Sequence, residues 1–103
     1  MTTQVDEFVA RLRDAMPGVP IEIDAPANPK GEWWIDIFLH GGPAMEVTWR
    51  HDKGFGVCHA RPAVFGEGPD EVYEDMNVAL RRVLQLARAE IKKRELAEAF
   101  RSA

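Results

Sequence analysis

The chain holds little of the chemistry on which many enzymes and secreted proteins depend. Its 103 residues include one cysteine, Cys58, and one serine, Ser102. A single cysteine excludes an internal disulfide, which favours a reducing, cytoplasmic compartment. Because the only serine lies one residue from the end of the sequence, a serine nucleophile is not expected.

The sequence also lacks the patterns of membrane and secreted proteins. No apolar run approaches the roughly 18 residues that span a bilayer, and residues 1–6 show neither the basic nor the apolar region of a signal peptide. Hydrophobic residues make up 46% and charged residues 29% of the chain, the balance of a soluble globular protein. We therefore expect a single domain over residues 1–103 that does not contact membranes.

Charge is unevenly distributed along the chain. Residues 76–103 hold seven basic and three acidic side chains, so they carry +4 and the remaining residues −8, for a net charge of −4. DNA-binding domains present a basic patch on a basic domain, so nucleic-acid binding is not expected. An acidic body with a basic C-terminal helix fits association with a second copy, as a homodimer, or with another protein partner. A solvated helix face is the alternative.

Two helices are predicted, one near each end of the chain. Thr3 can cap a first helix that Pro17-Gly18 ends. Asp75 can cap a second helix, whose apolar stripe over residues 76–91 repeats with the helical period.

The apolar stripe of the second helix breaks near its end. At 100° per residue, Arg94 falls inside the stripe, while Leu96 and Phe100 fall on nearly the opposite face. Either the helix stops near Arg94 and the tail folds back, or the end of the chain frays, or Leu96 and Phe100 meet another chain. Residues 92–103 are therefore predicted to be a frayed or a partner-binding tail.

Four strands are predicted between the helices, at residues 20–24, 33–40, 44–50 and 55–61. The first is expected at a sheet edge because proline begins it. The order indicates an α+β, two-layer domain: an antiparallel four-stranded meander flanked by an N-terminal and a long C-terminal helix. The face that both helices cover is expected to hold Ile35, Ile37, Val47 and Trp49.

The apolar pattern also favours one strand register. A three-residue loop at 41–43 keeps apolar residues opposite one another, whereas a two-residue loop puts Ile37 opposite Glu46. The favoured register pairs Leu39 with Met45, Ile37 with Val47 and Ile35 with Trp49. On the other face it pairs Trp34 with Arg50, Asp36 with Thr48 and Phe38 with Glu46. The register of the fourth strand stays open: the core is faced either by Phe55 and Val57, or by Gly56, Cys58 and Ala60.

Few residues have the spacing of a catalytic or metal site. Cys58 and His59 are neighbours on a strand and point to opposite faces, which argues against a shared metal ion or a cysteine–histidine pair. No CxxC, HxxxH or HxH pattern occurs, so no metal, cofactor or catalytic residue is predicted. We expect Cys58 to be a small core residue. In one register His59 reaches Glu46, as a His–carboxylate dyad or as a surface ion pair.

Residues 52–57 and 65–73 are rich in glycine, aromatic and acidic side chains. Neither glycine pair belongs to a phosphate-binding motif, and the acidic run lacks the order of an EF-hand. We expect the glycines to allow a turn, Pro69 to open a helical turn, and Val72 and Tyr73 to pack onto the core.

The leading site candidate is the sheet face that holds Trp34 and Phe38, beside Asp36, His40 and Arg50. Aromatic residues ringed by charges are typical of protein interfaces. The alternative is that a loop, at residues 25–30 or 63–69, lies across the two aromatic side chains.

The runs Gly54-Phe55-Gly56-Val57 and Phe65-Gly66-Glu67-Gly68-Pro69-Asp70-Glu71-Val72-Tyr73 resemble a segment of small bacterial α+β domains. These domains are associated with Xre-like helix-turn-helix regulators, as their non-DNA-binding part. The resemblance covers residues 32–90 and implies a regulatory or partner-binding domain. Because a single helix precedes the first strand, the chain departs from the pattern by lacking a helix-turn-helix, and direct DNA binding is not implied.

The sequence therefore favours a small non-enzymatic bacterial protein that acts through protein–protein interaction or self-association. The alternative is a small-molecule or metal-binding sensor or enzyme, with its site near residues 54–73 and His59. Substituting Trp34 and Phe38 by Ser would separate the two hypotheses, because only an interaction protein should then lose its partner or its oligomeric state while staying folded. The predicted interface residues are Trp34, Phe38 and Arg50 on the sheet, and Leu96 and Phe100 on the tail.

Overall fold

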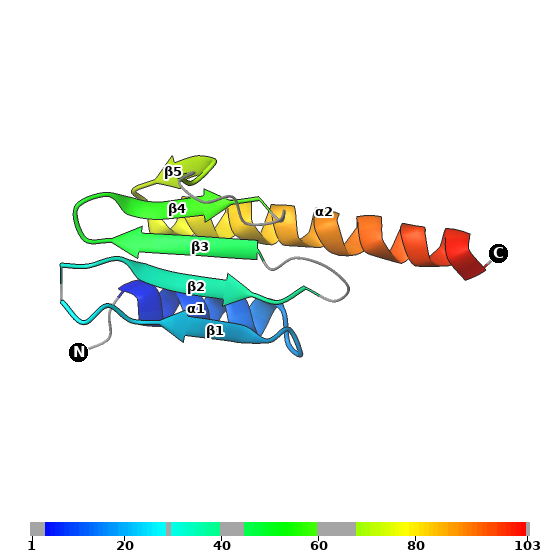
Figure 1. Cartoon of the computed structure of the whole chain (residues 1–103), viewed down its shortest axis with the longest axis horizontal. Helices are drawn as coiled ribbons and strands as arrows, with labels where there is room; N and C mark the ends of the chain where they lie inside the picture. The colour runs from blue at the N-terminus through cyan, green and yellow to red at the C-terminus, as the bar shows by residue number, and fades with distance from the viewer. Residues whose placement is uncertain (1–3, 29, 40–44, 60–67, 103) are drawn as a thin grey trace.

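An antiparallel sheet and two helices make up the part of the chain that the computed structural model describes, residues 4–28, 30–39, 45–59 and 68–102 (Figure 1). The elements are α1 (Gln4–Ala15), β1 (Ile21–Asp24), β2 (Trp33–Ile37), β3 (Met45–Arg50), β4 (Gly54–Cys58), β5 (Glu71–Tyr73) and α2 (Met76–Ser102). The strands lie in the sheet in chain order, each antiparallel to the next. The α+β class and the edge position of the first strand are thus confirmed, but the described residues form five strands, not four.

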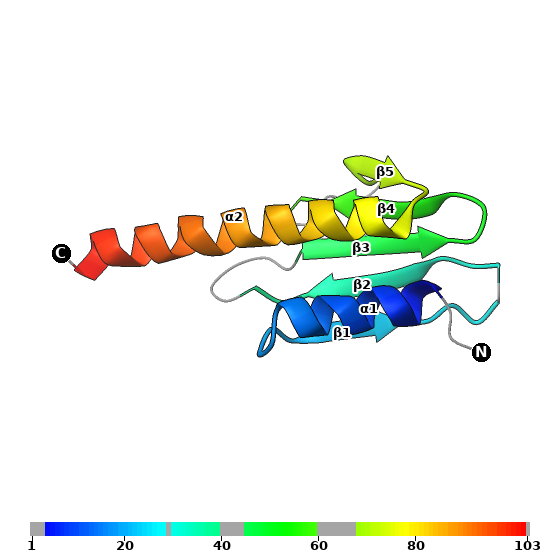
Figure 2. The same cartoon turned by 180° about the vertical axis from the view of Figure 1, so that it is seen from behind.

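Both helices cover the same face of the sheet, as predicted. Figure 2 shows α1 across β1 and β2, and α2 across β3 and β4. The 27 residues of α2 span about 40 Å, so the end of this helix extends well beyond the strands (Figure 1). No described helix lies on the other face, which we call the open face.

The core forms between the helices and one face of the sheet. Phe8 of α1 stacks on Phe55 of β4, with ring centroids 4.8 Å apart. Ala79, Val83 and Ala87 recur every four residues along α2 and are fully buried. Two of these three side chains are single methyl groups, so α2 can approach the sheet closely.

The register between β2 and β3 differs by two residues from the predicted one. Ile35 lies opposite Val47, Ile37 opposite Met45 and Trp33 opposite Trp49. On the open face, Trp34 lies opposite Thr48, not opposite Arg50. Glu46 lies opposite Asp36, not opposite Phe38. A shift of two residues keeps every side chain on its predicted face. The observed register also gains a cross-strand Trp–Trp pair, which aromatic side chains favour.

The fourth strand resolves the alternative left open by the sequence. Phe55 and Val57 are fully buried in the core, and Gly56 points to the open face. Cys58, expected in the core, is instead half-buried beside Glu46 on the open face. Residues 60–61, predicted to continue this strand, lie outside the described residues, as do Thr3, His40 and the predicted loop at 41–43.

The helical turn predicted at Pro69 is replaced by β5. The backbone N–H of Asp70 donates to the carbonyl oxygen of Val57 at 3.0 Å, and the next three residues pair with β4. Alternation along this strand turns Tyr73 toward the core and Val72 toward the open face, where it is exposed rather than buried. The expected packing is therefore confirmed for Tyr73 and wrong for Val72.

The second helix follows the sequence pattern closely. Asp75 Oδ1 accepts hydrogen bonds from the backbone N–H groups of Asn77 and Val78, at 2.8 and 3.1 Å, and so caps α2. The helix continues through Arg94, which pairs with Glu90 at 3.2 Å, and does not stop there.

Gly54→Ala is expected to destabilise the fold by about 2–3 kcal/mol, because two penalties coincide. Gly54 has φ +85°, and a Cβ there would lie 2.6 Å from the carbonyl oxygen of Tyr73. Gly18→Ala is the matched control, since Gly18 has φ +86° and open space around it. In urea unfolding, the free energy of unfolding of the control should fall by about 1 kcal/mol. Equal losses in both variants would contradict the close β4–β5 packing.

Candidate functional site

The open face, which is turned toward the viewer in Figure 1, combines acidic, aromatic and glycine positions of the sheet. Strand alternation places these residues on it: Glu22, Asp24, Trp34, Asp36, Glu46, Thr48, Arg50, Gly54, Gly56, Cys58 and Val72. Two of the three interface residues predicted on the sheet, Trp34 and Arg50, are among them. The third of these, Phe38, directly follows β2, and its backbone N–H donates to the carbonyl oxygen of Pro20 at 2.9 Å.

Three carboxylates lie side by side across the open face. Glu22 of β1 is opposite Asp36 of β2, which is opposite Glu46 of β3; we call these three residues the acidic row. Burial, then the charges of Glu22 and Asp24, raises the pKa of Asp36. Burial, then Asp36 and Glu32, raises the pKa of Glu46. Like charges directly opposite one another destabilise a sheet, so the acidic row weakens the fold at neutral pH.

Two aromatic side chains lie on either side of the acidic row. Trp34 precedes Asp36 by two residues in β2, and Phe38 follows Asp36 by two residues. Trp34 is 40% and Phe38 39% exposed, so the described residues do not bury them. Of the two loops predicted to cover them, residues 25–30 are described except Pro29, and residues 63–67 lie outside the described part of the chain.

A shallow hollow lies at the Arg50 end of the open face. It has a volume of about 280 Å³, and Gly54, Gly56 and Thr48 are among the residues that line it. A Cβ on Gly56 would lie 2.6 Å from Thr48 Oγ1 and 2.9 Å from Pro69 Cβ, so only glycine fits there. Arg50 Nε lies 3.3 Å from Asp52 Oδ1, so the guanidinium charge at this end is partly neutralised.

A second polar cluster lies on the helix-covered side, at the β5 edge. Glu71 accepts hydrogen bonds from Arg82 Nε at 2.8 Å and Arg82 Nη2 at 3.1 Å, and from the hydroxyl of Tyr73. His59 Nε2 lies 2.6 Å from Glu71 Oε2. The predicted partner of His59 was Glu46, which is wrong because the two residues lie on opposite faces of the sheet.

The geometry of this cluster is that of an ion pair, Glu71 with Arg82, that fixes β5 to α2 and that we call the clamp, rather than that of a general base. Hydrogen bonds from Arg82, then from His59 and Tyr73, lower the pKa of Glu71 to about 2. A carboxylate with such a low pKa and occupied oxygens is a weak base at neutral pH. Glu71 also raises the pKa of Tyr73, which keeps the phenol protonated. The contacts join β5 to α2 and hold the edge strand in place.

Glu71→Gln is expected to destabilise the protein by about 1–2 kcal/mol at pH 7, because the charged acceptor of Arg82 is lost. Since the folded-state pKa of Glu71 is lowered from its ordinary 4.5 to about 2, its stabilisation is complete above pH 4.5 and is lost as the pH falls toward 2. The difference between wild type and variant in urea unfolding should therefore vanish in acid. Glu74→Gln is the matched control on an exposed neighbour. A loss that does not depend on pH would contradict the clamp.

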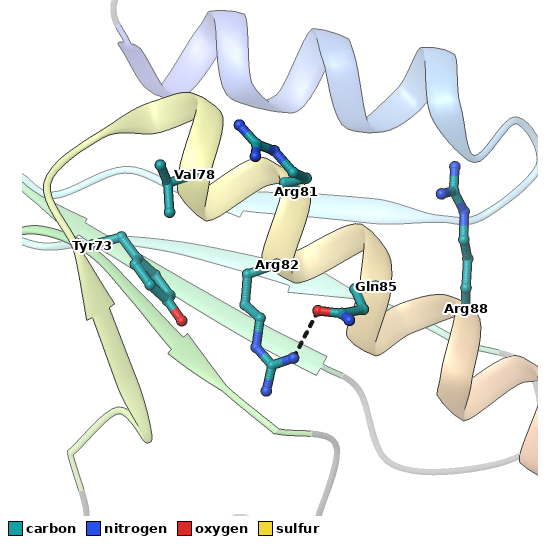
Figure 3. Close-up of a pocket in the computed structure, with 6 residues that line it drawn as sticks. All are labelled: Tyr73, Val78, Arg81, Arg82, Gln85 and Arg88. Atoms are coloured by element: carbon teal, nitrogen blue, oxygen red, sulfur yellow. Dashed lines mark hydrogen bonds between the residues drawn. The ribbon is translucent and has the colours of Figure 1, made fainter.

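A wider hollow of about 510 Å³ lies along α2 beside Tyr73 (Figure 3). Figure 3 shows Arg81 and Arg88 on the α1 side of the helix, whereas Arg82 extends on the Tyr73 side and donates to Gln85. The charge of Arg82 is already neutralised by Glu71. The three guanidinium groups therefore do not converge on one point, and the hollow lacks the geometry of an anion site.

The tail residues Leu96 and Phe100 lie apart from the open face. Both project from the end of α2, with 55% and 83% of their surface exposed. Within the described ranges, no group of three or more His, Cys, Asp or Glu side chains could hold a metal ion. None of the described helices combines the length and apolar character needed to cross a bilayer. Sequence reasoning did not find the acidic row, Glu71 or Arg82.

The chain was also compared with known proteins. No family model, no curated protein and no solved structure matches it.

Proposed function

We propose that the protein acts by binding another polypeptide through its open face, and that the partner segment is apolar and positively charged. The observation that carries this proposal is the acidic row between two half-exposed aromatic residues. The role is non-enzymatic, and the regulatory setting that the sequence resemblance implies belongs to the same proposal.

The acidic row supports a cationic partner. Asp36 has a carboxylate neighbour on each side, Glu22 and Glu46, and no described salt bridge neutralises any of the three. A face exposed only to solvent would be more stable if the residues beside Asp36 were neutral or positively charged. Lysine or arginine side chains of a partner would neutralise these carboxylates. Relief of the repulsion between them would then contribute to the free energy of binding.

The aromatic residues support a polypeptide partner rather than a small ligand. Trp34 and Phe38 are four residues apart along the chain, or about 13 Å in extended backbone, and the acidic row lies between them. The hollow on this face has about 280 Å³, just below the usual range of small-molecule sites. A partner helix or strand can instead contact both aromatic side chains and the carboxylates together. Exposed tryptophan is typical of the residues that dominate binding energy in such interfaces.

Selection from a random peptide library displayed on phage tests this proposal. The immobilised wild-type protein is the target, and a folded Trp34→Ser/Phe38→Ser variant serves for counter-selection. The expected result is enrichment of peptides that combine Lys or Arg with aromatic or aliphatic residues and that do not bind the variant. If no peptide depends on the open face, or if the enriched peptides are acidic, the proposed function is wrong.

A further inference from the structure

We propose that the segment bound by the open face is the C-terminal end of α2 of a second copy of the chain, so that copies associate head to tail. This inference rests on the proposed function of the open face and names its partner. It follows from the charge, exposure and direction of the last three turns of α2.

The end of α2 carries one stripe that is both basic and apolar. At 100° per residue, Lys92, Lys93, Leu96 and Phe100 fall within about 100° of the helix surface. All four side chains are exposed. The acidic residues of this segment, Glu95 and Glu98, fall outside the stripe. The end of α2 thus has the partner chemistry inferred for the open face.

The two surfaces also match in length. The stripe runs eight residues from Lys92 to Phe100, about 12 Å along a helix axis, and Trp34 and Phe38 span about 13 Å of strand. Leu96 and Phe100 lie about 6 Å apart along the helix axis, so they can contact one of the two aromatic side chains while the lysines reach the acidic row. The complementarity is both electrostatic and apolar, as in specific interfaces.

The fold prevents a chain from using its own tail in this way. Both helices lie on the covered side of the sheet, and α2 extends away from the strands (Figures 1 and 2). At 100° per residue, Leu96 lies about 140° and Phe100 about 100° around the helix from the buried Val83, so neither side chain faces the sheet. The stripe of one copy therefore does not meet the open face of the same copy.

The contact joins two different surfaces, the stripe of one copy and the open face of a second. After one such contact, the first copy still has a free open face and the second copy still has a free stripe. Repeating the contact in the same direction therefore adds further copies.

Mixing two complementary variants of the full chain tests this inference. The face variant, Trp34→Ser/Phe38→Ser, keeps its tail, and the tail variant, Leu96→Gln/Phe100→Gln, keeps its open face. In sedimentation velocity, wild type should form larger species as its concentration rises, and each variant alone should stay monomeric. An equimolar mixture should form a one-to-one complex and nothing larger. Asp36→Lys/Glu46→Lys is the second face variant, used if the first does not fold.

Salt dependence and a tail control complete the experiment. Raising the salt from about 0.1 M to about 1 M shortens the Debye length from about 10 Å to about 3 Å and should weaken the association several-fold. Glu95→Gln, outside the stripe, should leave the association intact. Association of the tail variant alone or of the face variant alone, or absence of a complex in the mixture, would overturn the inference. If wild type stays monomeric while selected peptides still bind the open face, the inference fails and the proposed function stands.

Discussion

Substituting Trp34 and Phe38 together by Ser is expected to weaken binding of a selected basic peptide at least about a hundredfold, which corresponds to about 2.7 kcal/mol. Aromatic residues at the centre of an interface commonly contribute 2 kcal/mol or more each, and their contributions are not additive. Fluorescence polarisation of the labelled peptide measures the loss. The variant should remain folded, because both side chains are about two-fifths exposed and make no part of the core.

Ile23→Ser is the matched control for this loss. Ile23 is 38% exposed and lies in β1 of the same sheet, but on the helix-covered side, opposite Ile35. The substitution removes exposed apolar surface from the other side of the sheet and should leave peptide affinity within about twofold. If Ile23→Ser weakens binding as much as the open-face variant does, the partner does not bind the open face.

Replacing Asp36 by Asn and Glu46 by Gln is expected to change stability and binding in opposite directions. Removing like charges that face one another should stabilise the fold by about 1 kcal/mol at pH 7. The same change should weaken peptide binding about tenfold or more, because the cationic side chains lose their acceptors. Urea unfolding and fluorescence polarisation measure the two effects.

The pH dependence of the added stability follows from the raised pKa values of Asp36 and Glu46. A carboxyl group with a raised folded-state pKa destabilises the fold above that pKa, and the penalty is absent below its ordinary value. The variant should therefore be more stable than wild type at pH 7. The two proteins should be equally stable once the pH falls below the ordinary pKa values of the two groups, 3.8 and 4.5. Asp14→Asn removes an exposed carboxylate from α1 and is the control. A variant that is less stable than wild type at pH 7 would contradict the cost assigned to the acidic row.

The features that depend on short-range spacing could be predicted from the sequence. The cap at Asp75, the stripe of α2 and the exposure of Leu96 and Phe100 follow from the helical period, which neighbouring residues determine. The covered and open faces of β2 and β3 follow from strand alternation. This alternation places Trp34 on the open face whichever residues lie opposite it.

The features that depend on pairing between distant residues could not be predicted. A shift of two residues leaves the alternation intact, so the pattern could not distinguish the true β2–β3 register. The acidic row exists only in that register, because the predicted one placed Glu46 opposite Phe38. The three residues of β5 are too few to show a period, and its formation depends on pairing with Val57. Without β5, no sequence signal connected Glu71 to Arg82.

The indole N–H signals of the three tryptophans provide the most direct test of the open face as the binding surface. Trp33 and Trp49 pair with each other on the helix-covered side, and only Trp34 lies on the open face. In a two-dimensional ¹H–¹⁵N spectrum of the labelled protein, adding a selected basic peptide should shift the indole signal of Trp34. The signals of Trp33 and Trp49 should stay in place. An unchanged Trp34 signal under a saturating peptide concentration, with shifts at the other two indoles, would contradict the account.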